Sequence, residues 1–375
     1  MGTVVWLSLA IIFYTFIGYP IVLFLLNQTL KNEDSHLNNY FPTVEVIMIV
    51  RNASQLVKAK IHSLNALTYP KDRFKILIVS DASQDDTVVL IKQFDQENIR
   101  CVNNSFKSTK SACINQAVRM SSAEIIFLTD VRQTLDSSSL QKLTRHFADE
   151  RVGAVSGELI LLEPETNNFS QSMDAYWRYE KFIRHQESQL ASVPGVTGAI
   201  YAIRRRLFQP IPEQTLLDDV LIPMNVILQG KRVLFEPQAL AFDVPSADVE
   251  REKKRKTRTL AGNWQMLALQ PKMLNPFRNS IWWQLVSHKI LRLFCPFLLF
   301  ALYLSSAILS WSGTTYFLLF LVQTTAYLSV VLANFLPVMM NISIIRMAHS
   351  FLLLMWFSLL GFWSFITNRH LTIWK

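Results

Sequence analysis

The sequence predicts an α/β domain with a mostly parallel sheet, flanked by transmembrane helices, one N-terminal and about three C-terminal. Half of the 375 residues are hydrophobic and only 17% are charged, against roughly 25% charged residues in soluble proteins. The apolar residues gather near the two ends of the chain. Between them, short β-branched runs alternate with stretches of helical periodicity, which is typical of a parallel sheet covered by helices on both faces.

The apolar ends predict membrane spans. Residues 4–26 carry no charged side chain, and about 20 apolar residues cross a bilayer. No basic residue precedes this stretch and no small-residue cleavage site follows it, so we expect an uncleaved anchor rather than a signal peptide. Further apolar stretches lie at 293–311, 314–340 and 347–366. Because the last one carries His349 near its start, a re-entrant or interfacial helix stays open for it.

Residues 273–292 mix tryptophans with basic residues just before the C-terminal spans. Indole rings and long cationic side chains both favour the headgroup region, so we expect an amphipathic helix at the interface. An ordinary amphipathic core helix is the alternative. The chain then divides into an anchor with linker (1–41), a soluble α/β domain (42–272), this interfacial helix and the C-terminal spans (293–375).

The formal charge of +9 is concentrated between Arg251 and Arg258, where only Glu252 and Thr257 are neither lysine nor arginine. Such a run is typical of a solvated or lipid-facing surface. No nucleic-acid-binding motif accompanies it, so nucleic acid is not an expected partner. The three cysteines lack Cys-x-x-Cys spacing, which argues against structural zinc and for a reducing compartment. Neither a dinucleotide fingerprint nor a P-loop is present.

Two aspartates follow apolar strands of the soluble domain. Strands are expected at 44–50, 74–79 and 124–128, and helices at 55–67, 87–94, 110–120 and 137–147. Ligands bind beyond the carboxyl ends of the strands in such sheets, so Asp81 and Asp130 are expected at the mouth of one crevice. For Asp85 and Asp86 we favour a capping role at the helix that begins near Thr87.

In their order and spacing these pieces resemble the family 2 glycosyltransferases, which have the GT-A (Rossmann-like) fold, from residue 44 to about residue 262. Asp81 begins a stretch that is similar to the family's Asp-x-Ser-x-Asp-x-Thr signature. The resemblance implies that this aspartate contacts the base of a nucleotide sugar. Asn52 matches the end of the family's opening strand, although Ala53 replaces a glutamate there.

Two more stretches support the resemblance around the donor. Residues 108–115, which include Lys110, are similar to the family's Gly-Lys-x-x-Ala-Leu-Asn segment, with a threonine in place of the glycine. Gly198 opens a stretch that is similar to the strand lining the donor pocket. Both residues are therefore expected to contact the donor.

The family's Asp-x-Asp metal motif is altered here to Asp130-Val131-Arg132. The resemblance implies Mg²⁺ or Mn²⁺ at this position. Since Mg²⁺ needs few protein ligands, Asp130 is expected to anchor the metal while Arg132 contacts a phosphate bidentately. The alternative is that Arg132 neutralises Asp130 in a salt bridge and that no metal binds.

Asp218 and Asp219 resemble the end of the family's Thr-Glu-Asp motif, whose last aspartate deprotonates the acceptor hydroxyl. The resemblance implies that Asp219 is the general base of an inverting transfer and that Asp218 positions the acceptor. The structural alternative is a pair of aspartates at a helix start, where negative charge favours the helix dipole.

The basic run is similar to the Gln-x-x-Arg-Trp motif of processive members. Arg258 and Gly262 match the family pattern, whereas Arg255 replaces the glutamine and Thr259 replaces the tryptophan. Arg255 and Arg258 are expected to bind the donor diphosphate. Loss of the tryptophan weakens the case for polymer synthesis with coupled translocation.

Tyr176 and Trp177 offer aromatic faces that could stack on an acceptor sugar. A Tyr/Trp cluster inside a core helix is equally plausible, because aromatic side chains also dominate cores.

The resemblance implies an inverting transfer from a nucleotide sugar, with UDP as the expected nucleotide, to a lipid-linked acceptor or a growing glycan, as in polysaccharide biosynthesis. Transfer of one sugar to a polyprenyl phosphate or membrane lipid, and a catalytically silent membrane scaffold, stay open. Lys31, Arg278, Lys289 and Arg292 lie near spans, which favours a cytoplasmic catalytic domain in the cell or inner membrane. Membrane lipids, and membrane proteins of a glycan assembly system, are the expected partners.

Overall fold

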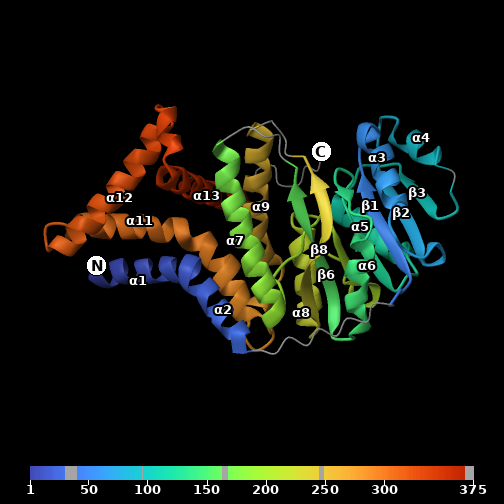
Figure 1. Cartoon of the computed structure of the whole chain (residues 1–375), viewed down its shortest axis with the longest axis horizontal. Coiled ribbons are helices and arrows are strands. Elements are labelled where there is room, and N and C mark those ends of the chain that lie inside the picture. The colour runs from blue at the N-terminus through green and yellow to red at the C-terminus, as the bar shows by residue number, and fades with distance from the viewer. Residues whose placement is uncertain (30–39, 95, 163–167, 245–248, 368–375) are drawn as a thin grey trace.

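A computed structural model describes residues 1–29, 40–94, 96–162, 168–244 and 249–367. Its α/β domain contains a sheet with the strand order β3-β2-β1-β4-β7-β6-β8-β5. Figure 1 shows this sheet on one side of an elongated molecule and the apolar helices on the other. The strands are β1 (Val44–Val50), β2 (Phe74–Asp81), β3 (Ile99–Asn104), β4 (Ile125–Leu128), β5 (Thr134–Leu135), β6 (Val152–Leu161), β7 (Tyr201–Arg204) and β8 (Arg232–Asp243).

The first half of the sheet is parallel, as predicted. β1 pairs in parallel with both β2 and β4, and β2 pairs in parallel with β3. All seven side chains of β1 are buried, because helices cover both faces of this strand. α5 (Lys110–Met120) and α8 (Asp218–Leu228) pack on one face, whereas α3 (Ser54–Asn65) and α6 (Ser139–Thr144) pack on the other.

The second half of the sheet is mixed. β7 is antiparallel to β4 and β6, β5 is antiparallel to β8, and β6 pairs in parallel with β8. Of these strands, β7 lies in the stretch opened by Gly198 that resembles a strand of the family. The sequence did not reveal β6 and β8, because β6 contains serine, glycine and glutamate and β8 contains Pro237. Parallel pairing still predominates, so the predicted α/β class holds.

The loop after β2 joins two helix starts. The carboxylate of Asp85 accepts the backbone N–H of Thr87, at the first residue of α4 (Thr87–Lys92), and that of Ser54 at the start of α3. The capping role predicted for Asp85 is therefore confirmed. Asp86 occupies the N-cap position of α4 but makes no side-chain capping bond.

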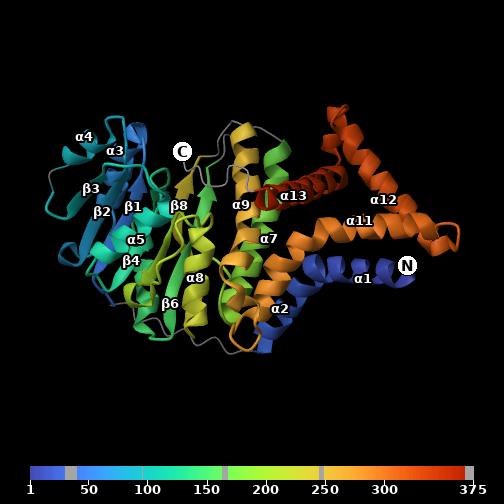
Figure 2. The same cartoon turned by 180° about the vertical axis from the view of Figure 1, so that it is seen from behind.

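Two long helices separate the sheet from the apolar helices. In both views α7 (Asn168–Leu190) and α9 (Val249–Leu269) run side by side between the two parts of the molecule (Figures 1 and 2). α13 (Ser343–Ile366) packs closely on α9: a Cβ atom added to Gly361 would lie 2.8 Å from the Cβ atom of Leu260. Only glycine permits so close an approach of the two helices.

In the described part of the chain, four helical segments are long and apolar enough to cross a membrane. They are Gly2–Thr29, which contains α1 (Gly2–Phe13) and α2 (Tyr19–Thr29), Trp282–Leu309, which contains α10 (Trp282–Gln284) and α11 (Leu291–Leu309), α12 (Thr314–Ala333) and α13. This agrees with one N-terminal and three C-terminal spans.

The segment predicted as a separate interfacial helix, 273–292, is divided in the structure. Its first part is a loop with a short 3₁₀ turn at Pro271–Leu274, whereas the helix that begins at Trp282 continues through a π-helical turn, Leu285–Ile290, into α11. No proline or glycine lies between 282 and 292 to interrupt it. Its depth relative to the headgroups stays a prediction.

Candidate active site

Three of the predicted residues, although distant in sequence, meet at one ammonium group. Lys110 is the first residue of α5, and its Nζ atom lies 3.0 Å from Oδ1 of Asp130 and 3.4 Å from Oδ2 of Asp218. Asp130 follows β4, and Asp218 begins α8. Burial opposes the charge on Lys110, but the two carboxylates outweigh it and raise the lysine's pKa well above its ordinary value. The charged ammonium group of Lys110 is thus held between the carboxylate of Asp130, after a strand, and that of Asp218, at the start of a helix.

Asp219 lies beside this cluster. Its backbone oxygen accepts the N–H of Val196 at 2.9 Å, and a Cβ atom added to Gly198 would lie 3.2 Å from its Oδ2 atom. Gly198 therefore leaves space for the carboxylate. Burial and the neighbouring charge of Asp218 raise the pKa of Asp219 to about 6, against the opposing effects of Lys110 and Lys289. A carboxylate with such a pKa is suited to accept a proton near neutral pH.

Tyr201, on β7, lies close to the same carboxylates. Its side chain is buried, and in the described part of the chain its hydroxyl has no hydrogen-bond partner. Burial and the charges of Asp218, Asp219 and Asp130 raise its pKa well above the ordinary value, so it stays a neutral donor. Buried donors are normally paired.

Asp81 is fully buried at the end of β2. Its Oδ1 atom accepts the backbone N–H of Ser108 at 2.6 Å, and Nη1 of Arg51 lies 3.9 Å from Oδ2. Among the described atoms, Oδ2 has no hydrogen-bond partner. Because Oδ2 is itself buried, the contact of Asp81 with a nucleobase stays a prediction.

Asn52 is committed to a local contact instead. Its side-chain oxygen accepts the N–H of Gln84 at 2.9 Å, and its own N–H donates to Oγ of Ser83 at 3.1 Å. Its φ of 46° lies in the left-handed region, which asparagine tolerates better than most residues. Asn52 therefore joins the ends of β1 and β2, and its contact with a donor stays a prediction.

Arg132 pairs with Asp243 at the end of β8, not with Asp130. Its Nε atom lies 2.9 Å from Oδ1 and its Nη2 atom 2.6 Å from Oδ2, while Nε2 of Gln133 lies 2.9 Å from the same Oδ2. The alternative of a salt bridge to Asp130 is therefore not what the structure contains. Half of the guanidinium side chain is exposed, so its phosphate contact stays a prediction.

Lys60 is a residue that the sequence did not reveal. It lies on α3 with 1% of its surface exposed, and its Nζ atom donates to Oγ1 of Thr129 and to the carbonyl oxygen of Gln133, both at 2.7 Å. Burial lowers its pKa to about 7, although the charge of Asp130 acts in the opposite direction. Lys60 thus braces both ends of the turn that presents Asp130.

The segment before Asp218 is held by α9. Nη2 of Arg258 lies 3.5 Å from the carbonyl oxygen of Leu216, and Oε1 of Gln265 accepts the N–H of the same residue at 2.9 Å. A Cβ atom added to Gly262 would lie only 2.5 Å from Cγ of Leu217. Arg258 and Gly262 therefore support the start of α8.

The remaining predicted contacts are not tested by this geometry. The side chain of Arg255 is exposed on α9, and a diphosphate contact of Arg255 or Arg258 stays a prediction. Trp177 is partly buried, and its Nε1 atom has no hydrogen-bond partner within the described residues. The side chain of Tyr176 lies outside the described part.

The partial exposure of Asp130 is compatible with the expected metal. The side chain of Asp130 is 41% exposed, and the Lys110 ammonium group is its ion-pair partner. Among the described residues, no group of three or more histidines, cysteines, aspartates or glutamates could hold a metal ion by itself. Mg²⁺ or Mn²⁺ would therefore need phosphate and water oxygens besides Asp130, which is the usual manner of Mg²⁺ binding with nucleotides.

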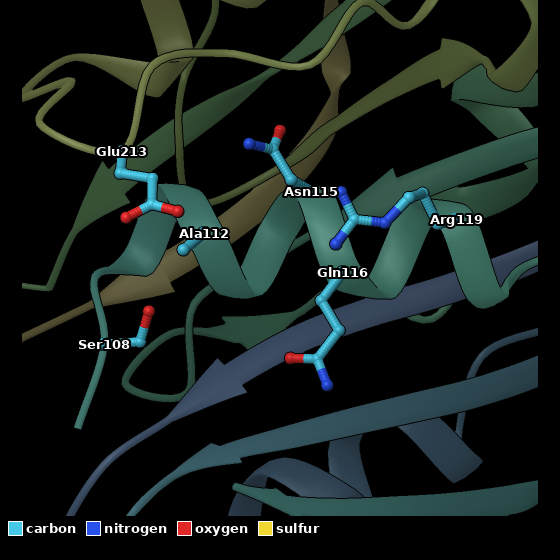
Figure 3. Close-up of a pocket in the computed structure, with 6 residues that line it drawn as sticks. All are labelled: Ser108, Ala112, Asn115, Gln116, Arg119 and Glu213. Carbon is cyan, nitrogen blue, oxygen red and sulfur yellow. The ribbon is translucent and has the colours of Figure 1, made fainter. Parts of the chain in front are cut away.

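A cavity of about 290 Å³ lies along α5 but holds none of the predicted site residues. Figure 3 shows its polar lining, formed by Ser108, Ala112, Asn115, Gln116, Arg119 and Glu213. Both amide atoms of Asn115 bind the backbone of Ile211, so this side chain is already used. The cavity adjoins the site only through Ser108, whose N–H binds Asp81.

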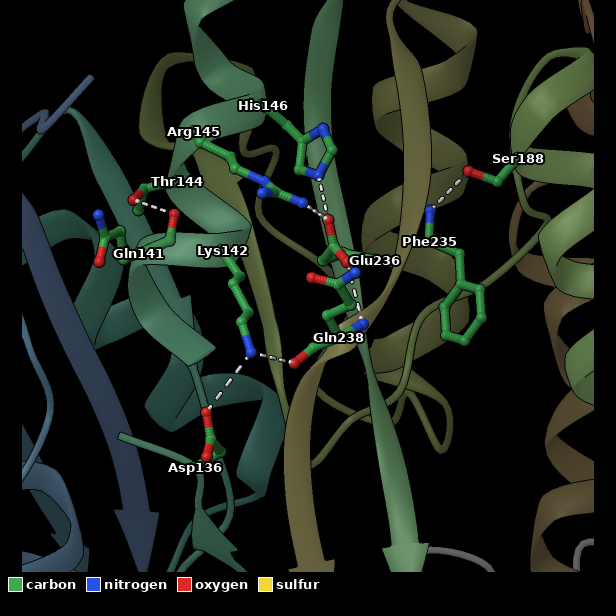
Figure 4. Close-up of polar contacts among 10 residues, drawn as sticks. All are labelled: Asp136, Gln141, Lys142, Thr144, Arg145, His146, Ser188, Phe235, Glu236 and Gln238. Carbon is green, nitrogen blue, oxygen red and sulfur yellow. Dashed lines mark hydrogen bonds and ion pairs between the residues drawn. The ribbon is translucent and has the colours of Figure 1, made fainter. Parts of the chain in front are cut away.

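A polar network holds β8, which carries Asp243, against the end of α6. Oε2 of the buried Glu236 lies 2.7 Å from both Nη2 of Arg145 and Nε2 of His146, as Figure 4 shows. Burial alone would raise the pKa of Glu236, but the hydrogen bond from His146 and the other contacts lower it to about 2. Lys142 adds a contact to the carbonyl oxygen of Gln238 at 3.0 Å.

The known proteins that the chain resembles include several glycosyltransferases. Residues 45–211 match the family model described as glycosyl transferase family 2. The chain is 24% identical over 244 residues to the probable glycosyltransferase YdaM of Bacillus subtilis, covering 59% of this chain and 55% of that protein. It is 21% identical over 197 residues to the beta-monoglucosyldiacylglycerol synthase of Trichormus variabilis, covering 51% and 42%. The chain thus spans about half the length of these curated relatives.

One solved structure resembles the whole chain. The mannosyltransferase PcManGT from Pyrobaculum calidifontis, in complex with GDP-Man and Mn²⁺, matches with a TM-score of 0.74 at 18% identity, covering 98% of this chain and 100% of that chain. At this identity the likeness concerns the fold, which is that of a GT-A domain with its apolar helices.

Proposed function

We propose that this chain, which belongs to the family 2 glycosyltransferases, is an inverting enzyme that moves a sugar from a nucleoside diphosphate to a lipid-linked acceptor or growing glycan at a membrane. One observation carries the proposal: Lys110 joins Asp130 to Asp218 directly beside Asp219. This cluster provides a metal-binding carboxylate, a fixed cation and a proton acceptor in one place. Helices apolar enough to cross a membrane follow in the same chain.

The donor is proposed to be a UDP-sugar. The unpaired oxygen of the buried Asp81 can accept the imide N–H of uracil, which supports a nucleobase at this position. Guanine also offers N–H donors, and the structurally similar mannosyltransferase was solved with GDP-Man. A GDP-sugar is therefore the donor to compare directly with UDP-sugars.

Transfer would proceed as a single displacement. Asp219 accepts the proton of the acceptor hydroxyl while its oxygen attacks the anomeric carbon from the face opposite the diphosphate. The new glycosidic bond forms as the bond between that carbon and the diphosphate oxygen breaks, which inverts the configuration. Lys110 and Asp218 hold the cluster in place. A divalent metal on Asp130, when bound, would stabilise the negative charge that develops on the leaving diphosphate.

Release of nucleotide from a donor panel tests the proposal. Purified protein in detergent or nanodiscs is incubated with UDP- and GDP-sugars, with Mg²⁺ or Mn²⁺ and with lipid extracts as acceptors. We expect acceptor-dependent release that Asp219→Asn abolishes. Asp72→Asn, which makes the same chemical change at an exposed aspartate in the loop before β2, is the matched control. No release from any donor would favour the silent scaffold.

We also propose that the catalytic domain faces the cytoplasm, where nucleotide sugars are made. Arg278, Lys289 and Arg292 lie at the start of the second candidate span, and basic residues close to spans favour the cytoplasmic side.

A further inference from the structure

Lys289 lies in the first turns of the helix Trp282–Leu309, where this candidate span meets the catalytic domain. We infer that its ammonium group binds the phosphate of a membrane lipid, so that the acceptor is a sugar joined to a lipid through phosphate. The inference rests on the proposed function and names its acceptor class.

The position of Lys289 relative to Asp219 supports this site. A Cβ atom added to Gly195 would lie 3.5 Å from both Cε and Nζ of Lys289, and one added to Gly198 would lie 3.2 Å from Oδ2 of Asp219. The two side chains therefore border the same short loop, 195–198. The N–H of Val196 in this loop also binds the backbone oxygen of Asp219 at 2.9 Å. A ligand at the ammonium group would thus lie next to the proton acceptor.

Lys289 has no hydrogen-bond or ion-pair partner among the described residues, whereas its charged neighbours are engaged. Arg184 donates to Oγ1 of Thr197 at 3.0 Å and to Oγ of Ser156 at 2.8 Å. The carboxylate of Glu180 pairs with both His288 and Arg292. The charges of Asp219, Glu180 and Glu187 act on the partly buried ammonium of Lys289, but none of these carboxylates forms an ion pair with it in the described structure. A charged group that leaves water is stabilised best by a direct partner.

Glu187, the other carboxylate near this position, is engaged through one oxygen, while its Oε2 atom is buried and has no hydrogen-bond partner among the described residues. Oε1 of Glu187 accepts from the hydroxyl of Tyr19 at 2.5 Å and lies 2.9 Å from Nδ1 of His288. Asp219 is close enough for its charge to act on Lys289, but no ion pair joins the two side chains in the described structure. A phosphate oxygen supplied from outside the chain would meet this need.

The location favours a lipid as the source of the phosphate. Trp282 and Trp283 precede Lys289 in the same helix, and indole rings mark the headgroup region of a bilayer. A phosphate at the head of an apolar chain would lie at that depth, and its tail could remain in the membrane beside the helix.

The chemistry of Asp219 restricts the acceptor further. The oxygen of a lipid monophosphate is already ionised, so its attack on the donor would not require a base. A sugar hydroxyl must lose a proton, and Asp219 can accept it. The phosphate held by Lys289 is therefore the link between acceptor sugar and lipid, and it stays unchanged while the new glycosidic bond forms at a sugar hydroxyl.

An acceptor panel tests the inference. A short polyprenyl diphosphate sugar, the matching polyprenyl monophosphate and a neutral glycosyl diacylglycerol are compared in nanodiscs with one donor. We expect the diphosphate-linked sugar to be used, with a KM that rises at least tenfold in Lys289→Met and is largely restored in Lys289→Arg. Lys272→Met, at an exposed lysine in the preceding turn, is the matched control and should leave KM unchanged.

Competition provides a readout that needs no variant. Farnesyl diphosphate should compete with the acceptor but not with the donor, and farnesol should not compete. Use of the neutral glycolipid with an equal kcat/KM, or an unchanged acceptor KM in a folded Lys289→Met variant, would overturn the inference. Turnover of the monophosphate by Asp219→Asn would overturn its hydroxyl step. Absence of nucleotide release with every acceptor would instead count against the proposed function.

Discussion

The pH dependence of transfer is the most direct test of Asp219 as the base. Only its ionised form accepts a proton, and its pKa is raised to about 6. We therefore expect kcat to increase about tenfold per pH unit below about pH 6 and to become constant at higher pH. A group that must be protonated would instead make the rate fall as the pH rises. The side of the pH profile on which the rate falls therefore distinguishes a general base from a general acid.

The surroundings of Asp219 account for the size of its pKa shift. The rise of its pKa from 3.8 to about 6 corresponds to on the order of 3 kcal/mol. Burial is the largest cause, and the charge of Asp218 comes next. Asp218→Asn removes that charge, so the midpoint of the profile should move to lower pH by about one unit or less. Asp219→Asn removes the base and should lower kcat about 10² to 10⁴-fold.

The assay measures initial rates between about pH 4.5 and pH 8.5 at saturating donor and acceptor, for both variants and for Asp72→Asn as control. A midpoint that moves to higher pH in Asp218→Asn would contradict the electrostatic account. A rate independent of pH from 5 to 8, or near-normal turnover by Asp219→Asn, would refute the assignment of the base itself.

The metal, the packing of α9, the buried Glu236 and the orientation can each be tested as well. EDTA should silence transfer and Asp130→Ala should weaken metal-dependent nucleotide binding by calorimetry, whereas full activity in EDTA would contradict the metal site. Gly262→Val should lower kcat about a hundredfold while donor affinity is kept, because its side chain would displace Leu217, 2.5 Å from the added Cβ atom; an unchanged kcat would show that the loop adapts. With its pKa lowered from 4.5 to about 2, Glu236 stabilises the fold by on the order of 3 kcal/mol above about pH 4.5, and this contribution is lost as the pH falls towards 2. Glu236→Gln should therefore lower the Tm at pH 7 by more than at pH 3, and an equal loss at both would argue against the charge. Four crossings with a cytoplasmic domain place residue 367 outside, so a cytoplasm-specific reporter fused there should be silent, and a strong signal would exclude four full spans.

The strand-end rule accounts for the part of the site that the sequence could predict. Asp81 and Asp130 follow apolar strands, and parallel strands present their carboxyl ends at one edge of the sheet. Lys110 begins a helix at the same edge, so its contact with Asp130 follows from local pattern and topology together. The prediction for Asp81 and Asp130 needed only the period of the apolar residues and the order of the elements, whereas Lys110 was identified by the resemblance of its segment to the family and its contact with Asp130 was not predicted.

Other contacts depend on pairings that local pattern does not contain. Arg132 binds Asp243, which lies 111 residues further along the chain on a strand that the apolar pattern did not reveal. Lys60 lies on an amphipathic helix, where a lysine normally marks the solvated face, yet it is buried beneath Asp130. Its burial is tolerated because two oxygen acceptors lie within 2.7 Å of its ammonium group. Whether such a lysine is buried or exposed can be seen only once the helix is packed against the sheet.

The layer formed by α7 and α9 connects the apolar helices directly to the segment that carries Asp218 and Asp219. Gly361 of α13 packs against Leu260 of α9, and two residues later Gly262 packs against Leu217, which precedes Asp218. Each contact is so short that a single added carbon would force a shift, and packed interiors transmit such shifts because they have little free volume. α7 has an equivalent connection, since its Glu180 pairs with Arg292 of α11 and its Arg184 binds Thr197 beside Asp219. The position of Asp219 is thus determined jointly by the sheet and by the helices expected to cross the membrane, which is the arrangement that the proposed transfer to a lipid-linked acceptor would require.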